Sequence, residues 1–102
     1  MAVGGGGTEL VVDTHLDLSG DRFARVMVRL VPESETYPEG VKYSMHYGTY
    51  DGETILRYDN AHATKGHERH TPDGTEEIDF PGWRELFARF RNEVTDHERQ
   101  HD

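Results

Sequence analysis

Residues 41–60 read VKYSMHYGTYDGETILRYDN and contain two alternating runs joined by a turn. In the first run, apolar or aromatic residues stand at every second position from Val41 to Tyr47. The following Asp51-Gly52 is a strong signal for a two-residue type I′ turn, because both turn positions need a positive φ. The predicted cross-strand pairs are Tyr47–Leu56 and Met45–Tyr58 on one face, and His46–Arg57 and Ser44–Asp59 on the other. The alternation therefore predicts a β-hairpin with one apolar and one polar face.

A second hairpin is predicted upstream, from Thr8–Leu18 and Phe23–Val31 joined at Ser19-Gly20-Asp21. A three-residue loop pairs apolar residues with apolar residues, whereas a slip of one position would mix the two faces. The predicted pairs are Leu16–Ala24, Thr14–Val26, Val12–Val28 and Leu10–Leu30.

A helix is predicted to begin near Pro81, because proline suits the first helical turn. Apolar residues then recur every three or four positions, at Trp83, Leu86, Phe87, Phe90 and Val94. Residues 61–74 are expected to be loop, and Glu76–Phe80 is a candidate fifth strand. The prediction is an α+β fold, with a four- or five-stranded antiparallel sheet and one C-terminal helix packed on its apolar face.

The chain has 102 residues, which suits a single domain. We expect residues 1–7 to be a flexible Gly-rich tail, residues 8–95 to form the domain, and residues 96–102 to be a charged tail. No apolar run is long enough for a membrane span and no basic-then-apolar signal begins the chain, so a cytoplasmic protein is expected.

The composition is acidic: twenty Asp and Glu face eleven Lys and Arg, giving a net charge of -9, and only Lys42 and Lys65 are lysines. This pattern resembles the proteins of salt-loving microbes, although an ordinary acidic protein remains the alternative. The charge argues against nonspecific nucleic-acid binding at low salt. Without cysteine, disulfides and thiolate metal sites are excluded.

The polar face of the two hairpins collects basic or titratable side chains at His15, Arg25, Arg29, Lys42, His46 and Arg57. One interpretation is a phosphate-binding surface, since arginine binds phosphate oxygens through two parallel hydrogen bonds. The other is a solvated face with ion pairs to Asp13, Asp17 and Asp59.

The densest polar segment is residues 57–70, RYDNAHATKGHERH, which holds three of the seven histidines. RNA cleavage without a metal needs a base, an acid and a cation beside the phosphate, and histidine suits the first two roles. Catalytic candidates are His70 and His67, with Asp59 orienting the base, and Arg57, Lys65 and Arg69 would hold phosphate. Three alternatives stay open: a solvated loop, loop capping by Asp59-Asn60, and a metal site of His62, His67 and His70, perhaps with Asp59.

Several of these segments resemble the TumE family of toxins from toxin–antitoxin modules. They are Gly40–Ser44, Asp51-Gly52, Arg57-Tyr58-Asp59-Asn60, and Lys65-Gly66-His67-Glu68-Arg69-His70, which is similar to the family's Lys-Gly-Asp-His-x-His signature. Phe80–Val94 is similar to the aromatic residue and short helix that close the family's sequences. The resemblance covers about residues 8–95.

The resemblance implies a cytoplasmic toxin whose partner is a helix-turn-helix antitoxin. Direct matches fall on Tyr58, Asp59, Asn60, Lys65, Gly66 and His70, whereas His67 stands where the family tends to have aspartate. The resulting hypothesis is a metal-independent, ribonuclease-like toxin acting on RNA, with no cofactor; the alternative is a protein-binding module that docks an antitoxin without catalysis. The expected substrate-binding residues are Arg57, Lys65, Arg69, Arg25, Arg29, His46, Tyr58 and Asn60.

Overall fold

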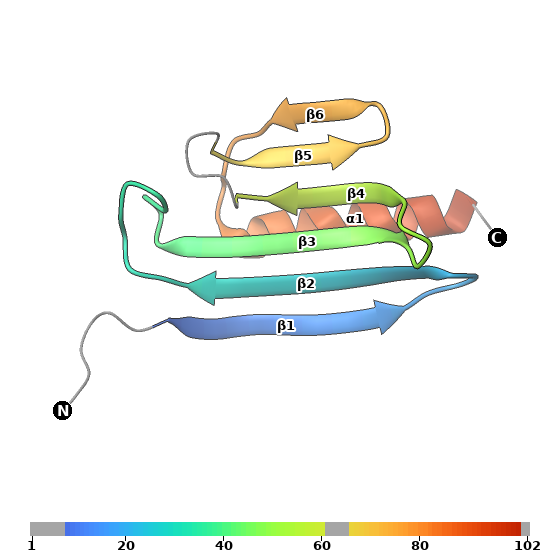
Figure 1. Ribbon diagram of the computed structural model, residues 1–102, viewed down its shortest axis with the longest axis horizontal. Coiled ribbons are helices and arrows are strands. Elements are labelled where there is room, and N and C mark those ends of the chain that lie inside the picture. The colour runs from blue at the N-terminus through green and yellow to red at the C-terminus, as the bar shows by residue number, and fades with distance from the viewer. Residues whose placement is uncertain (1–7, 61–65, 101–102) are drawn as a thin grey trace.

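The computed structural model describes residues 8–60 and 66–100 of the chain. Within them, six strands form one antiparallel sheet in sequence order, and one helix follows (Figure 1). The elements are β1 (Glu9–Asp17), β2 (Arg22–Leu30), β3 (Val41–Thr49), β4 (Thr54–Asp59), β5 (Glu68–Thr71), β6 (Gly74–Glu77) and α1 (Trp83–Gln100). The predicted α+β class is confirmed, with one strand more than expected. The expected tail at residues 1–7, His62 and Lys65 lie outside the described residues.

The β1–β2 hairpin follows the predicted register over most of its length. The confirmed pairs are Leu16–Ala24, Thr14–Val26 and Val12–Val28. The predicted Leu10–Leu30 pair is wrong, because the register shifts between Leu10 and Val12 and places Leu10 opposite Arg29. A bulge of this kind inserts one unpaired residue and reverses the alternation beyond it.

The β3–β4 hairpin has all four predicted pairs, but a different turn. The observed pairs are Tyr47–Leu56, Met45–Tyr58, His46–Arg57 and Ser44–Asp59. A type I′ turn needs positive φ at both turn residues, and among the described residues only glycines, including Gly52, have positive φ. The chain instead forms a longer loop in which Thr49 N donates to Glu53 O at 2.9 Å. A register shift at Gly48 absorbs the extra residue and preserves both faces.

The segment 61–74, predicted to be loop, contains strand β5, which forms a hairpin with β6 across Pro72-Asp73. The predicted fifth strand at Glu76–Phe80 is also misplaced, because β6 ends at Glu77. Both strands are almost entirely polar, so hydrophobic alternation could not reveal them. They are recognised by backbone pairing, because β5 pairs with β4 and β6 pairs with β5.

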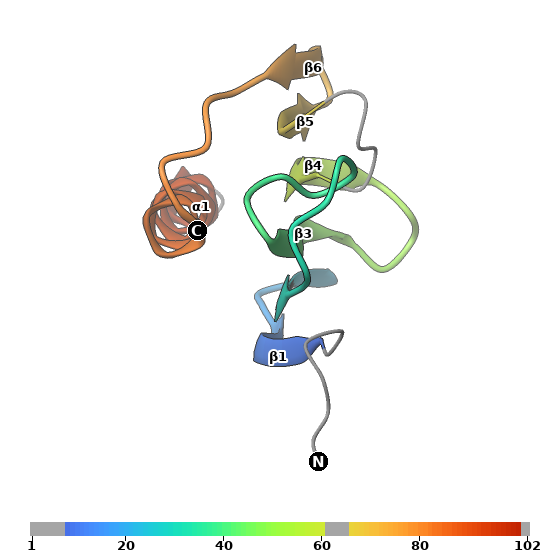
Figure 2. The same cartoon turned by 90° about the vertical axis from the view of Figure 1, so that its left-hand side faces the viewer.

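Helix α1 lies on one side of the sheet and covers its apolar face (Figure 2). The predicted stripe is confirmed: Leu86, Phe90 and Val94 are buried, and Trp83 and Phe87 are partly buried. They pack on the predicted inward residues of β3 and β4, of which Tyr47 and Tyr58 are fully buried. In the described part of the chain, no helix lies on the opposite face of the sheet (Figure 2).

The helix is longer than predicted, because residues 96–100 continue it and do not form a tail. Its last turns are tied to the sheet. Glu98 accepts a hydrogen bond from Arg22 Nε at 2.5 Å and another from the Tyr47 hydroxyl. The same hydroxyl lies 2.8 Å from His97 Nδ1. These contacts stabilise the helical conformation of the charged end of α1.

Candidate functional site

Five neighbouring strands each place one histidine or arginine in a single row across the uncovered face of the sheet. The row consists of His15 on β1, Arg25 on β2, His46 on β3, Arg57 on β4 and His70 on β5. Each residue is the direct cross-strand partner of the next, so backbones of successive members are about 5 Å apart. We call this set the histidine–arginine row. It joins the predicted polar face of the two hairpins to a residue from the histidine-rich segment.

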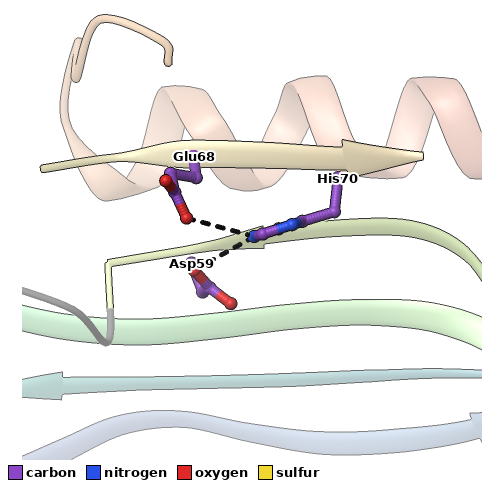
Figure 3. Close-up of side chains that lie close together, drawn as sticks. All are labelled: Asp59, Glu68 and His70. Atoms are coloured by element: carbon purple, nitrogen blue, oxygen red, sulfur yellow. Dashed lines mark ion pairs between the residues drawn. The ribbon is translucent and has the colours of Figure 1, made fainter. Parts of the chain in front are cut away.

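His70 is held at both of its ring nitrogens. Nε2 lies 3.4 Å from Glu68 Oε1 and 3.6 Å from Asp59 Oδ1 (Figure 3). On the other side of the ring, Nδ1 lies 3.0 Å from the hydroxyl oxygen of Thr75. Side chains from β4, β5 and β6 therefore surround the His70 imidazole.

Arg57 lies beside the same carboxylate. Its Nε is 2.8 Å from Asp59 Oδ2, and the Asp59 side chain is only 5% exposed. This contact has the distance of an ion pair without the direction of a hydrogen bond, and Nε finds no hydrogen-bond partner among the described residues. The Arg57 side chain is 42% exposed. Asp59 thus anchors the guanidinium from one side while the rest of it stays accessible to an anion.

His46 is partly buried and lies against an aromatic ring. Its Nε2 lies 3.1 Å from the Thr54 hydroxyl. The imidazole and the Phe23 ring are arranged edge to face, with 5.2 Å between their centroids. Burial lowers the pKa of His46, and the positive charge of Arg57 lowers it further. Both effects disfavour the imidazolium, so the neutral, proton-accepting form is favoured.

The β1 end of the row is engaged in surface contacts. His15 stacks on Phe23, and its Nε2 lies 2.8 Å from the Tyr50 hydroxyl and 3.5 Å from Asp17. Arg25 NH2 lies 3.4 Å from Asp13. With the Arg57–Asp59 contact, all three ion pairs expected of a solvated face are present. Exposed ion pairs, such as that of Arg25 with Asp13, contribute little to stability.

Arg29 and Lys42 pair with each other on the same face, at one end of the sheet. Arg29 is four residues from Arg25 along β2, which corresponds to about 13 Å. The sequence correctly groups these two residues with the polar face, but they lie apart from the centre of the row.

His67 and Arg69 do not join His70, because residues alternate between faces along β5. The His67 ring stacks on Phe80 and Tyr43, at 4.3 and 5.7 Å between centroids. Its Nδ1 lies 2.8 Å from the Tyr43 hydroxyl and its Nε2 lies 3.2 Å from Glu39. With 9% exposure, His67 is part of the packed interior.

Arg69 lies on the helix side, where it forms a cluster with Tyr58 and Glu93. Arg69 NH2 donates to Glu93 at 2.6 Å, and the Tyr58 hydroxyl donates to the same carboxylate. Burial, followed by the Glu93 contact, raises the pKa of Tyr58 to about 12. Two expected substrate-binding residues therefore connect the sheet to α1.

Asn60 has a structural role in the described chain. Its Oδ1 accepts a hydrogen bond from Tyr43 N at 3.0 Å, and its Nδ2 donates to Val41 O at 2.8 Å. The amide thus extends the β3–β4 ladder by one side chain. Its partners lie in strand β3, whereas the sequence suggested capping of loop amides. Lys65, the remaining predicted phosphate-binding residue, is outside the described residues.

Glu68 is the site residue that sequence reasoning missed. It is the cross-strand partner of Asp59, and its carboxylate reaches His70. The available signal was the period-two spacing of Glu68 and His70, which places both on one face of a strand. Asp59, Glu68 and His70 have ligating atoms within 4.8 Å of one another, so they are the described residues best placed to hold a metal ion. The metal group considered from the sequence is not assembled, since His67 lies elsewhere and His62 is outside the described residues.

The family described as "Toxin TumE" matches residues 8–98. No curated protein matches the chain, and no solved structure does. Among the described residues, no helix combines the length and apolar character required to cross a membrane. The match spans the whole described sheet and nearly all of α1, and it agrees with the resemblance found in the segments from Gly40 to Val94. The chain therefore belongs to the TumE toxin family.

Proposed function

We propose that this toxin cleaves RNA without a metal cofactor, using His46, Arg57 and His70 at the centre of the histidine–arginine row. The observation that carries the proposal is that two histidines flank one accessible arginine on three adjacent strands. The backbones of β3 and β5 are about 10 Å apart. This spacing leaves room for one phosphate between the two imidazoles, above Arg57.

The chemistry follows from the state of each group. His46, whose pKa is lowered, removes the proton from a ribose 2′-hydroxyl as that oxygen forms a bond to phosphorus. The bond from phosphorus to the 5′-oxygen breaks, and His70, oriented by Asp59 and Thr75, donates a proton to the departing oxygen. Arg57 stabilises the negative charge that develops on the phosphate. The products are a 2′,3′-cyclic phosphate and a 5′-hydroxyl.

The charge distribution favours contact with only a short stretch of RNA. The whole chain carries a net charge of -9, so it repels a long polyanion at low salt. Arg25 and Arg57 provide positive charge at the row itself. Single-stranded RNA, which reaches a flat sheet face more easily than a duplex does, is the proposed substrate, and the cytoplasm is the proposed place of action.

The test is cleavage of total RNA and of a short single-stranded oligonucleotide in the presence of EDTA. Because the acidic composition suits a salt-loving source, the assay is run in dilute and in molar KCl. Replacing His70 with alanine is expected to reduce the rate by about 100-fold or more, whereas His15→Ala, at the far end of the row, keeps it. Equal cleavage by the wild type and His70→Ala, or none by the wild type in either salt, refutes the enzymatic proposal.

A second proposal concerns the partner, since a toxin of this family implies an antitoxin. The helix leaves β1 and part of β2 uncovered, and a groove of about 650 Å³ runs between these strands and α1. Its apolar lining includes Leu16, Val26 and Phe90, and Leu16 is 58% exposed. We propose that the helix-turn-helix antitoxin docks an amphipathic segment here, with acidic residues toward Arg91 and Arg99 on the rim.

The alternative to RNA cleavage is that the chain only binds its antitoxin. If docking is the whole activity of the chain, a stable complex forms with the antitoxin and the purified toxin cleaves nothing. The groove and the histidine–arginine row lie on opposite faces of the sheet, so separate substitutions can test each function.

A further inference from the structure

Three ligating atoms converge at the β5 end of the row. Asp59 Oδ1 and Glu68 Oε1 lie 3.6 and 3.4 Å from His70 Nε2 (Figure 3). All three ligating atoms lie within 4.8 Å of one another. Asp59 is buried, and Glu68 and His70 are half-buried. These side chains come from two adjacent strands, so their spacing is set by rigid elements.

The two distances suit a metal better than a direct hydrogen bond. An N–H···O hydrogen bond spans 2.7–3.2 Å. Zinc binds histidine nitrogen and carboxylate oxygen at about 2.1 Å, which places neighbouring ligand atoms of a tetrahedron about 3.4 Å apart. The observed separations are therefore close to the edges of a tetrahedral site.

Two outer contacts turn the ligating atoms inward. Thr75 Oγ1, 3.0 Å from His70 Nδ1, can accept the Nδ1 hydrogen and leave the Nε2 lone pair toward the carboxylates. Arg57 Nε, 2.8 Å from Asp59 Oδ2, occupies the oxygen that faces away from His70. Supporting contacts of this kind orient the histidine and carboxylate ligands of known metal sites.

The local charge also favours a cation. Asp59 faces Glu68 across β4 and β5. Like charges directly opposite each other destabilise a sheet. Among the described lysines and arginines, Arg57 forms an ion pair with Asp59 and none forms one with Glu68.

We propose that Asp59, Glu68 and His70 bind a divalent transition-metal ion, with Zn²⁺ as the ion that fits the geometry. The bound ion is coordinated by Nε2 of His70. If His70 acts in RNA cleavage, a consequence that rests on the proposed function, the metal inhibits the toxin. The binding site itself does not depend on that function.

The experiment measures metal binding directly. Co²⁺, a spectroscopic substitute for Zn²⁺, is titrated into the full chain and followed by visible absorption, which is intense for four-coordinate Co²⁺. Zn²⁺ affinity is then measured by calorimetry. Glu68→Gln is compared with Glu77→Gln, which removes the same charge from the adjacent strand without touching His70.

We expect the Kd for Zn²⁺ to rise at least about tenfold in Glu68→Gln and to stay near the wild-type value in Glu77→Gln. His70→Asn provides a second ligand variant with the same expectation, and circular dichroism verifies that each variant is folded. No binding by the wild type, or equal affinity in Glu68→Gln and Glu77→Gln, overturns the proposal. Cleavage assays in EDTA report on RNA cleavage separately, so failure of either proposal is recognised independently.

Discussion

Arg57 and His70 stand directly opposite each other on β4 and β5, on the face of the sheet that α1 leaves uncovered. This pairing joins the polar face of the β3–β4 hairpin to the polar hairpin that follows it. The neighbouring pairs Tyr58–Arg69 and Asp59–Glu68 hold the same register. The site therefore depends on the β4–β5 ladder.

The electrostatic influence of Arg57 on His46 can be measured. The charged neighbours of His46 in the row are Arg25 on β2 and Arg57 on β4. Because burial and then Arg57 lower the His46 pKa, Arg57→Gln is expected to raise it, moving protonation of the imidazole to higher pH. Histidine resonances followed by NMR through a pH titration report this change. Arg91→Gln, on α1, is the control, and an identical His46 pKa in wild type and Arg57→Gln contradicts the prediction.

Glu93 is expected to stabilise the contact between sheet and helix. Burial opposes its ionisation, but hydrogen bonds from Arg69 and Tyr58 lower the pKa of Glu93 below its ordinary 4.5. A lowered folded-state pKa means that the stabilisation is present above pH 4.5 and is lost as pH falls through the folded value. Glu93→Gln should reduce the free energy of unfolding by about 1–3 kcal/mol at pH 7.

Urea denaturation at pH 7 and in acid checks this prediction. The difference between wild type and Glu93→Gln should shrink in acid, because the wild-type carboxylate is then protonated as well. Glu76→Gln, which removes an exposed carboxylate 3.6 Å from Arg69, should cost less than about 1 kcal/mol. A pH-independent difference would point to packing as its cause.

His67 is predicted to be a packing residue. His67→Ala removes the ring that stacks on Tyr43 and Phe80 and should cost on the order of 2 kcal/mol. His67→Phe keeps an aromatic ring and should retain RNA cleavage. Thermal unfolding and the oligonucleotide assay are measured together. Loss of cleavage in a folded His67→Phe variant would show a chemical role for this histidine.

Gly48 is required by the close approach of the β3–β4 loop. A Cβ at this position would lie 2.3 Å from Glu53 O, a backbone atom, so the loop would have to move. Gly48→Ala should lower stability by about 1–3 kcal/mol, seen as a lower Tm. Ser44→Ala, on the uncovered face of the same strand, should change stability by less than about 0.5 kcal/mol. An unchanged Tm for Gly48→Ala would contradict the observed loop.

Leu16 is predicted to contribute to antitoxin binding. Leu16→Glu places a charge in the apolar groove, and the antitoxin should bind at least about tenfold more weakly, since a buried unpaired charge is costly. Leu10→Glu, an exposed leucine of β1 outside the groove lining, is the matched control. Binding is measured by calorimetry and RNA cleavage in parallel. Equal weakening by both variants would place the antitoxin elsewhere.

Local sequence pattern was enough to predict the two long hairpins, the helix stripe and the separation of the two sheet faces. The reason is that period-two and helical spacings of apolar residues report directly which side of an element is buried. The same pattern correctly placed His15, Arg25, His46 and Arg57 on one face.

Tertiary structure alone decided the rest. The polar strand β5 has no apolar alternation, so only its backbone pairing with β4 shows that His70 joins the row and Glu68 lies on the same face. His67 and Arg69 face the helix side. Likewise, the bonds from Tyr47 and Arg22 to Glu98 extend α1 through a segment whose composition predicted a tail. In each case the interaction that sets the structure joins residues that are separated in the chain. The spacing of hydrophobic residues does not reveal such an interaction.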